Sequence, residues 1–172
     1  MSINIFNGDC FYYLKQIPDN SIDMVCADIP YGTTKCSWDA VIDLEAMWLE
    51  LNRVCKIDAA MIIFSAQPFT SILVSSNIKC WKTEWIWEKP NATGFLNAKK
   101  QPLRAHENIE VFYRKQPTYN PQMTNGHIRK ISSRSSAATE LYGGAHKLVS
   151  YDSTSRYPRD VQVFSSDKQK NS

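Results

Sequence analysis

The segment Asp28-Ile29-Pro30-Tyr31 combines a carboxylate, a fixed turn and a flat aromatic ring within four residues. It follows a short apolar run that predicts a buried strand, and ligands of α/β proteins bind at the carboxyl ends of such strands. Asp28 can accept a hydrogen bond from an amine, and the Ile29 carbonyl offers a second acceptor. Pro30 fixes the turn without adding an N–H donor, and Tyr31 provides a ring for stacking. The segment can therefore hold a planar heterocyclic amine.

The residues alone leave two interpretations of this segment. Acceptors that pull the amine hydrogens out of the ring plane would localise the nitrogen lone pair and make the amine a better nucleophile. The alternative is an ordinary strand-ending turn with an aspartate cap. The sequence has no Gly-X-Ser-X-Gly elbow, which argues against an unrelated α/β hydrolase.

The elements that must position the segment follow from the hydrophobic pattern. We expect strands at 3–6, 22–27, 59–64, 83–88 and 109–113, a strand-like run at 160–164, and helices at 10–17, from Asp43 to about Lys56, and from Pro68. The inward-facing side chains expected on the last two helices are Leu44, Met47, Trp48, Leu51 and Val54, and Phe69, Ile72 and Leu73. Alternating strands and helices predict an α/β fold with a mostly parallel sheet.

Composition narrows the class of protein. The chain has 172 residues, of which 43% are hydrophobic and 22% charged, and this is a globular composition. The longest apolar run is far shorter than the ~18 residues of a membrane span, and the amino terminus lacks the pattern of a secretory signal. Five cysteines without metal-ligand spacing favour a reducing cytoplasm and no metal site.

Charge is distributed unevenly along the chain. Residues 1–96 carry seven basic and eleven acidic residues, a net charge of −4, whereas residues 97–172 carry thirteen and six, a net charge of +7. This asymmetry indicates either a half that faces nucleic acid or a solvated basic surface. From Gln116 to Arg159 apolar periodicity is weak and polar residues dominate, as in a functional insertion or a mobile region.

A set of motifs spread over nearly the whole chain, weakest across 118–150, resembles the amino-group DNA methyltransferases of the permuted, β-type arrangement, in particular their phage and prophage branch. The motifs are Asn7-Gly8-Asp9-Cys10, Ile17-Pro18-Asp19-Asn20-Ser21-Ile22-Asp23, Asp28-Ile29-Pro30-Tyr31-Gly32, Trp38-Asp39, Phe64-Ser65-Ala66-Gln67-Pro68-Phe69, Glu84-Trp85-Ile86-Trp87-Glu88-Lys89-Pro90, Gly94-Phe95-Leu96-Asn97-Ala98-Lys99-Lys100, Arg104-Ala105-His106-Glu107-Asn108 and Tyr157-Pro158-Arg159.

The resemblance implies transfer of a methyl group from S-adenosylmethionine to the exocyclic amine of a flipped base in DNA, as in restriction–modification systems. Asp28, Ile29, Pro30 and Tyr31 would be the catalytic motif, and Asp9, Cys10 and Asp28 would contact the cofactor. The family more often has Pro where this chain has Ile29, a mild departure because that position contributes its carbonyl. Asp at position 28 favours adenine over cytosine.

The resemblance also implies that a part of the family's fold is missing. The family continues through His-Pro-Thr-Gln-Lys-Pro to a strand that ends in a glycine-rich cofactor loop, and this sequence has no Gly-X-Gly. We therefore expect a partial Rossmann-like methyltransferase fold, lacking the cofactor-loop strands. Activity of the chain alone would be impaired or absent. The strand at 22–27 would form an apolar sheet edge that favours self-association or a partner supplying the missing half. The alternatives are a non-catalytic DNA-binding remnant and one half of a split enzyme.

Three regions are expected. Residues 1–114 form the catalytic α/β part, 115–159 form an irregular basic insertion that is a candidate DNA target-recognition region, and 160–172 form a short strand and tail. The residues expected to contact double-stranded DNA are Lys89, Lys99, Lys100, Arg104, Arg129, Lys130 and Arg134. No membrane association is expected, and the resemblance implies a cytoplasmic protein of bacterial or phage origin.

Overall fold

The computed structural model describes residues 3–32, 36, 39–134 and 149–164. These residues divide into two compact units, which are described separately. Unit 1 comprises the described residues up to Thr118 and from Asp160 onward, and unit 2 comprises those between Tyr119 and Arg159. Unit 2 lies within the segment 115–159, whose role as an insertion stays a prediction, and residues 165–172 of the expected tail lie outside the described residues.

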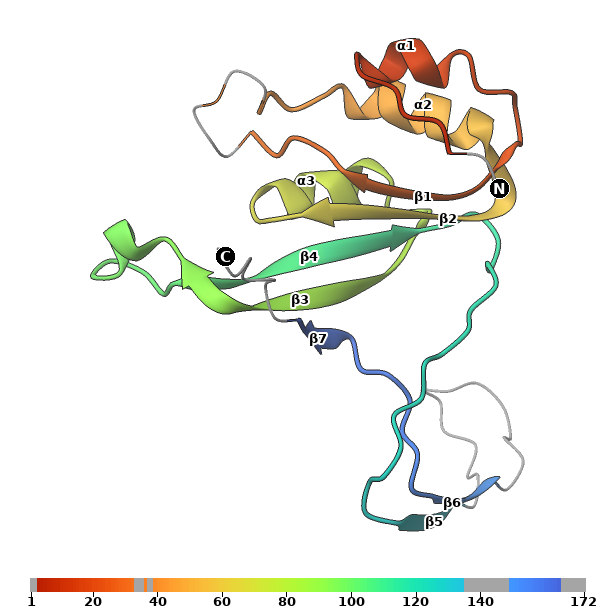
Figure 1. Cartoon of the computed structure of the whole chain (residues 1–172), viewed down its shortest axis with the longest axis vertical. Coiled ribbons are helices and arrows are strands. Elements are labelled where there is room, and N and C mark those ends of the chain that lie inside the picture. The colour runs from red at the N-terminus through yellow and green to blue at the C-terminus, as the bar shows by residue number, and fades with distance from the viewer. Residues whose placement is uncertain (1–2, 33–35, 37–38, 135–148, 165–172) are drawn as a thin grey trace, which may run out of the picture. The chain divides into compact units, whose positions relative to one another are not determined.

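Unit 1 contains a five-stranded sheet with helices (Figure 1). Its elements are α1 (Cys10–Leu14), β1 (Ile22–Asp28), α2 (Leu44–Val54), β2 (Cys55–Ser65), α3 (Phe69–Ser76), β3 (Trp81–Thr93), the 3₁₀ turn η1 (Phe95–Asn97), β4 (Arg104–Phe112) and β7 (Val161–Val163). The α/β class is confirmed. No helix of the described residues is long and apolar enough to span a membrane.

The strand order is β1-β2-β4-β3-β7, and the sheet is mixed. β1 pairs with β2 and β3 with β7 in parallel, but β4 runs antiparallel to both β2 and β3. Four of the five strands run in the same direction and only β4 is reversed, so the mostly parallel sheet expected from the sequence is confirmed for the described residues, with one antiparallel strand inside it. β3 and β4 are joined by a short hairpin, and a hairpin forces an antiparallel pair, whereas a parallel pair needs a crossover such as α2.

The core lies where α2 and α3 pack on β2 and β4. Alternate residues of β2 point into it, and Trp48 of α2 packs its ring against Phe112 of β4 with centroids 4.7 Å apart. The buried apolar residues are Met47, Trp48, Leu51, Val54, Cys55, Ala59, Met61, Ile63, Phe69, Leu73 and Phe112. The expected inner face of α2 is confirmed, with Leu44 only partly buried.

α2 begins as the sequence indicates, because the Asp43 side chain accepts a hydrogen bond from the Ala46 N–H at 3.1 Å. Near its end, Arg53 donates to the Leu14 and Ile17 carbonyl oxygens and forms ion pairs with Asp19 and Glu50. One side chain thus ties the end of α1 and the following turn to α2.

Two expectations about unit 1 are wrong. Residues 3–6 do not form a strand: no described strand pairs with them, and Ile3 and Ile5 are 86% and 91% exposed. Ile72 is exposed rather than inward-facing, since only Phe69, Thr70 and Leu73 of α3 are buried.

Unit 2 contains a two-stranded antiparallel sheet of β5 (Lys130–Arg134) and β6 (Val149–Ser153). The Arg129 guanidinium makes two hydrogen bonds to the Asp152 carboxylate, at 2.8 and 2.6 Å. The segment expected to be irregular therefore contains a small sheet held partly by side-chain hydrogen bonds.

Glu110 is a fully buried carboxyl group on β4. Its Oε2 accepts a hydrogen bond from the Trp81 indole at 2.6 Å, while Oε1 has no hydrogen-bond partner in the described part of the chain. Burial raises the pKa of Glu110, the Trp81 hydrogen bond opposes this rise, and Glu84 directly opposite on β3 adds to it.

We expect Glu110→Gln to change how stability depends on pH. The variant keeps an oxygen acceptor for Trp81 and loses the ionisable group. Because folding raises the pKa of Glu110, the unfolded chain loses its proton first, and Glu110 makes the wild type less stable as pH rises from about 5 toward about 8. The stability of Glu110→Gln relative to wild type should therefore increase over that range, as measured by urea unfolding at both pH values.

Glu88→Gln is the matched control, because Glu88 is an exposed residue of β3. Its stability difference from wild type should not change with pH. A Glu110→Gln effect of equal size at both pH values would contradict the assigned ionisation.

Candidate functional site

The carboxyl end of β1 and the carboxyl end of β2 lie side by side. The two strands are parallel, and Asp28 pairs in register with Phe64. β4 runs the opposite way, so its first residues reach the same edge, where Asn108 pairs with Ser65. β3 is antiparallel to β4 and brings its last residues there as well. Residues far apart in the sequence therefore meet at one edge of the sheet.

This edge is hollowed into a cavity of about 410 Å³. The residues that line it come from the ends of β1, β2 and β3, from the start of β4 and from the loop after β1: Asp28, Ile29, Pro30, Tyr31, Asp39, Ala66, Lys89, Thr93, Arg104, His106 and Glu107. The volume lies within the range of small-molecule sites. The whole predicted catalytic motif thus faces one cavity.

Tyr31 connects the motif to both the cavity and the core. Its hydroxyl donates a hydrogen bond to Asp28 Oδ1 at 2.6 Å. Its ring stacks on Phe69 with centroids 5.6 Å apart and an interplanar angle of 19°. Burial, followed by the hydrogen bond to the Asp28 carboxylate, raises the pKa of Tyr31, so the phenol remains a donor near neutral pH. Phe69 therefore supports one face of the Tyr31 ring, and the hydroxyl orients the Asp28 carboxylate.

Asp39 holds the backbone of the loop that follows β1 and carries the rest of the motif, residues 29–32, which we call the motif loop. Its Oδ1 accepts hydrogen bonds from the Tyr31 N–H at 2.9 Å and from the Gly32 N–H at 2.8 Å, and the residue is only 7% exposed. Gly32 has a φ of +67°, and a Cβ there would lie 2.7 Å from a Val41 methyl group. A side chain at position 32 would therefore strain the turn that Asp39 stabilises.

The far wall of the cavity is charged. Lys89 forms an ion pair with Glu107 across β3 and β4, and its ammonium also lies 5.2 Å from the centre of the Trp87 ring. Lys89 is thus neutralised by a neighbouring carboxylate, which weakens the expectation that it contacts phosphate. Arg104 and His106 lie at the start of β4 on the same wall.

The structure places the other predicted site residues elsewhere. Asp9 caps α1 by accepting hydrogen bonds from the Phe11 and Tyr12 N–H groups, Cys10 is the exposed first residue of α1, and neither is among the residues that line this cavity. Their cofactor contacts stay predictions.

The predicted DNA contacts fall into two groups. Lys99 and Lys100 are exposed in the hairpin between β3 and β4, close in sequence to Arg104. Arg129 is paired with Asp152 in unit 2, Lys130 is exposed at the start of β5, and Arg134 is the last residue of β5.

Three residues of the site are not predicted from the sequence as site residues. Asp39 and Glu107 belong to longer motifs of the sequence, and the helical spacing predicts Phe69 to lie in the core. Phe69 is indeed buried, but one face of its ring supports Tyr31. Helical periodicity predicts that such a residue faces inward, but it does not predict which buried side chain the residue contacts.

We expect Asp39→Ala to loosen the motif loop. Removing the shared acceptor leaves the Tyr31 and Gly32 N–H groups without their partner, and their amide exchange should accelerate by about 10- to 100-fold. Asp39→Asn retains an amide oxygen and should restore most of the protection. Hydrogen exchange resolved by residue measures both.

Asp43→Ala is the control, because Asp43 likewise accepts a hydrogen bond from a backbone N–H, that of Ala46 at the start of α2. It should speed exchange at Ala46 and leave Tyr31 and Gly32 unchanged. Unaltered exchange at Tyr31 and Gly32 in Asp39→Ala would contradict the role of Asp39.

The sequence is similar to one curated methyltransferase. The Type II methyltransferase M.BamHI of Bacillus amyloliquefaciens is 29% identical over 79 residues, covering 40% of this chain and 19% of the relative. This chain therefore matches only a small part of that relative's length. No family model matches the chain.

The fold is similar to that of solved DNA methyltransferases. The PvuII DNA methyltransferase, named as cytosine-N4-specific, superposes with a TM-score of 0.56 at 13% identity, over 94% of this chain and 56% of that one. The M1.HpyAVI–SAM complex gives a lower TM-score of 0.47 at 16% identity, over 64% and 56%. The match in sequence and the match in fold together support the resemblance of this chain to the amino-group DNA methyltransferases that its motifs indicate.

Proposed function

We propose that this chain carries the base-amine site of an S-adenosylmethionine-dependent DNA methyltransferase, and that the methylated group is the exocyclic amine of adenine. The observation that carries the proposal is the cavity wall formed by Asp28, Ile29 and Tyr31. There a carboxylate, a strand-end backbone and an aromatic ring face one space, and the ring is supported from behind by Phe69.

This arrangement suits an aromatic amine. Such a nitrogen is a weak nucleophile because its lone pair is delocalised into the ring. Asp28 and the Ile29 carbonyl would accept the two amine hydrogens and localise the lone pair on nitrogen, while Tyr31 stacks on the base. Tyr31 occupies Asp28 Oδ1, so we assign the amine to Oδ2. As the nitrogen acquires a methyl group it becomes positive, and the Asp28 carboxylate stabilises that charge until the nitrogen releases one of its two protons to water.

The cofactor proposal rests on the same cavity. When bound, S-adenosylmethionine would supply a methyl group on a positively charged sulfur, whose bond to carbon breaks as the nitrogen–carbon bond forms. The cavity wall carries the carboxylates of Asp28, Asp39 and Glu107 as well as the cations of Lys89 and Arg104, so it offers both acceptors and donors to a polar small molecule, and the cavity volume fits a small molecule. Asp9 and Cys10 of α1 remain proposed contacts to the rest of the cofactor.

Adenine and cytosine both carry an exocyclic amine that could be methylated at this site. An aspartate at position 28 favours adenine, whereas the PvuII enzyme is named as specific for cytosine N4. Incubating the chain with methyl-labelled S-adenosylmethionine and genomic DNA, followed by separation of the nucleosides, distinguishes them. Labelled N6-methyladenine supports the proposal, and labelled N4-methylcytosine assigns the site to cytosine.

A second function is binding of DNA without catalysis, alone or as one half of a split enzyme. It is favoured by the position of β1, which is the first strand of the described sheet and has paired backbone on one side only, with Met24 57% exposed. Such an edge can accept another strand. The same incubation, combined with a DNA-binding measurement and analytical ultracentrifugation, distinguishes this function from methyl transfer. A chain with this function would bind DNA or assemble without transferring a methyl group.

We expect Asp28→Ala to lower the rate of methyl transfer by at least about 100-fold while changing DNA affinity less than about twofold. The variant removes the carboxylate that localises the amine lone pair and leaves the basic surface intact. Radiolabel incorporation under single-turnover conditions measures the rate.

The matched control is Asp23→Ala. Asp23 is also on β1, but its carboxylate is exposed and paired with Lys56. This variant should transfer methyl groups at the wild-type rate. Turnover of Asp28→Ala at a rate close to that of Asp23→Ala would remove Asp28 from the mechanism.

We also expect Lys99 and Lys100 to contact DNA phosphates. Each phosphate contact releases condensed counterions, so Lys99→Ala/Lys100→Ala should reduce the slope of log affinity against log salt concentration by about 2. Lys79→Ala/Lys82→Ala, at exposed lysines near the start of β3, is the matched double control and should keep the slope. An unchanged slope in Lys99→Ala/Lys100→Ala would reject the phosphate contact.

A further inference from the structure

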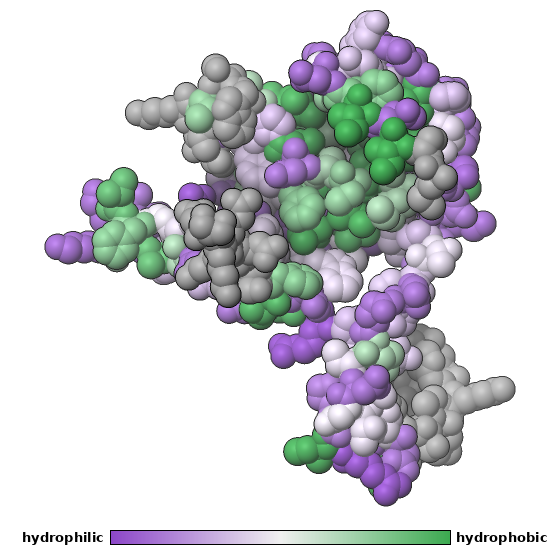
Figure 2. Space-filling model, viewed as in Figure 1, coloured by the Kyte–Doolittle hydropathy of each residue, from purple (hydrophilic) through white to green (hydrophobic). Residues whose placement is uncertain are grey.

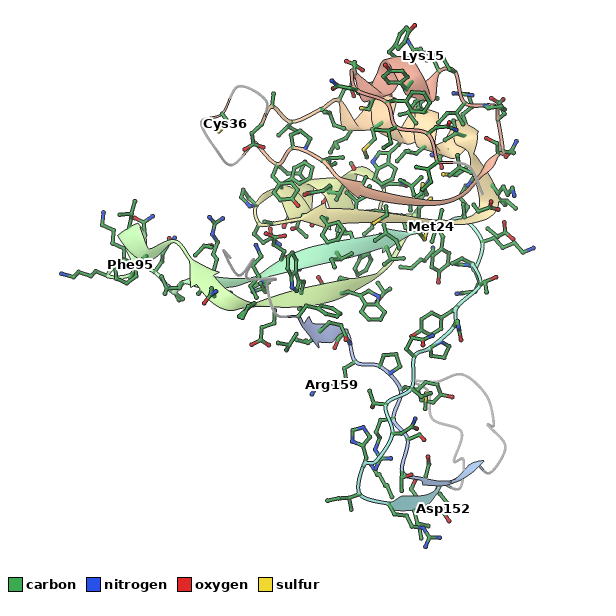
Figure 3. All side chains as sticks on the ribbon, in the orientation of Figure 1. Lys15, Met24, Cys36, Phe95, Asp152 and Arg159 are labelled. Carbon is green, nitrogen blue, oxygen red and sulfur yellow. The ribbon has the colours of Figure 1, made fainter. Side chains whose placement is uncertain are left out.

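The hairpin between β3 and β4 presents apolar side chains to solvent. We define the hairpin tip as residues 94–103. Within it Phe95 is 80% exposed, Leu96 is 99% exposed and Leu103 is 40% exposed. Figure 2 shows this apolar group at the far left of the molecule, and Figure 3 places Phe95 at the end of the hairpin. No described residue covers Phe95 or Leu96, so their apolar surfaces are open to a binding partner.

The hairpin tip is ordered by its own backbone. Gly94 has a φ of +91° and accepts a hydrogen bond from the Asn97 N–H at 2.9 Å, and Ala98 donates to Phe95 at 3.0 Å. Asn97 in turn accepts hydrogen bonds from the Lys100 and Gln101 N–H groups, at 2.8 and 3.0 Å. The apolar side chains are thus held outward on a folded turn, which lowers the entropy that a partner must remove on binding.

The hairpin tip begins at the rim of the cavity. Thr93 and Arg104, the residues on either side of it, pair across β3 and β4, and both line the cavity that contains Asp28. The tip extends the same two strands past this pair (Figure 1). A ligand large enough to cover the mouth of the cavity would therefore meet the hairpin tip as well.

The charged residues of the hairpin tip, together with Arg104, which follows it, are all basic. Lys99, Lys100 and Arg104 are exposed, and the sequence from Gly94 to Arg104 contains no acidic residue. The partner that covers the tip must accept cations on its surface and apolar side chains in its interior. Duplex DNA has this combination, with phosphates outside and stacked bases inside.

We propose that the hairpin tip is a wedge that inserts Phe95 and Leu96 between base pairs of double-stranded DNA, next to the base that leaves the stack for the cavity. This inference rests on the proposed function. The lysines hold the phosphate backbone, and the apolar pair fills space between the separated bases. Insertion of apolar side chains unstacks a base step at a cost of a few kcal/mol, which the new contacts offset.

A wedge that separates base pairs unwinds the duplex where it inserts, and plasmid DNA offers many different sequences, so the target sequence need not be known in advance. The full chain is bound to nicked circular plasmid, the nick is sealed by ligase, and the topoisomers are compared after removal of the protein. Wild type should shift the topoisomer distribution. At equal bound protein, Phe95→Ser/Leu96→Ser should reduce the shift by at least about fivefold.

Two control variants separate wedge insertion from other effects. Ile72→Ser/Ile78→Ser changes two exposed apolar residues away from the hairpin and should unwind as wild type does. Lys99→Ala/Lys100→Ala should need more protein to bind, but should unwind as wild type at equal occupancy. Circular dichroism of Phe95→Ser/Leu96→Ser should match wild type, because neither side chain is part of the core.

Three outcomes would overturn the wedge. The first is wild-type binding without unwinding. The second is full unwinding by Phe95→Ser/Leu96→Ser; if that variant also loses self-association in ultracentrifugation, the tip is assigned to a second copy of the chain. The third is binding to anionic phospholipid vesicles but not to DNA. Failure of wild type to bind any DNA also removes DNA from the proposed function, whereas the first two outcomes leave that function standing.

Discussion

The parallel pairing of β1 with β2 is the constraint on which the site depends. Because both strands run the same way and Asp28 is level with Phe64, the residues after each strand emerge at the same edge of the sheet. α2 makes this pairing feasible by carrying the chain back between them, and its buried face supplies much of the core. The antiparallel pair β3–β4 then needs only a hairpin to bring Lys89, Thr93 and Arg104 to that edge. A shift of one residue in β1 would turn its side chains to the other face and remove Asp28 from the cavity.

The motif loop gains its geometry from residues outside the motif. Asp39 fixes the backbone at Tyr31 and Gly32, and Phe69 fixes the ring of Tyr31. The Tyr31 hydroxyl then fixes the Asp28 carboxylate. The Phe69–Tyr31 and Tyr31–Asp28 contacts lead from the core to the Asp28 carboxylate, and in each of them one side chain limits the freedom of the next. A carboxylate held in this way would have little reorganisation left to undergo on binding the proposed amine.

Local signals in the sequence predict much of this arrangement. The cap at Asp43, the helical spacing from Met47 to Val54 and the apolar run before Asp28 all act within a few residues, and the structure keeps them. The sequence-based predictions fail where the structure of a segment depends on contacts with residues that are distant in the sequence. Residues 3–6 have the composition of a strand, but a strand forms only beside another strand. Ile72 fits a helical pattern, yet the narrow contact of α3 with the sheet leaves it outside. The ion pair between Lys89 and Glu107 follows from cross-strand register, which composition does not encode.

Because β1 lies at the edge of the sheet, the site at its end should unfold before the rest of the sheet on heating. Hydrogen bonds and packing resist local unfolding, and β1 has a neighbouring strand on one side only, whereas β2 and β4 have neighbours on both. The opening free energy of β1 should accordingly be smaller than that of the central strands. Asp28 is the last residue of β1, so the acceptor carboxylate belongs to one of the less protected parts of the sheet. Thermal inactivation would then precede the cooperative melting of the core around Trp48 and Phe112, and the two temperatures would differ in the same protein.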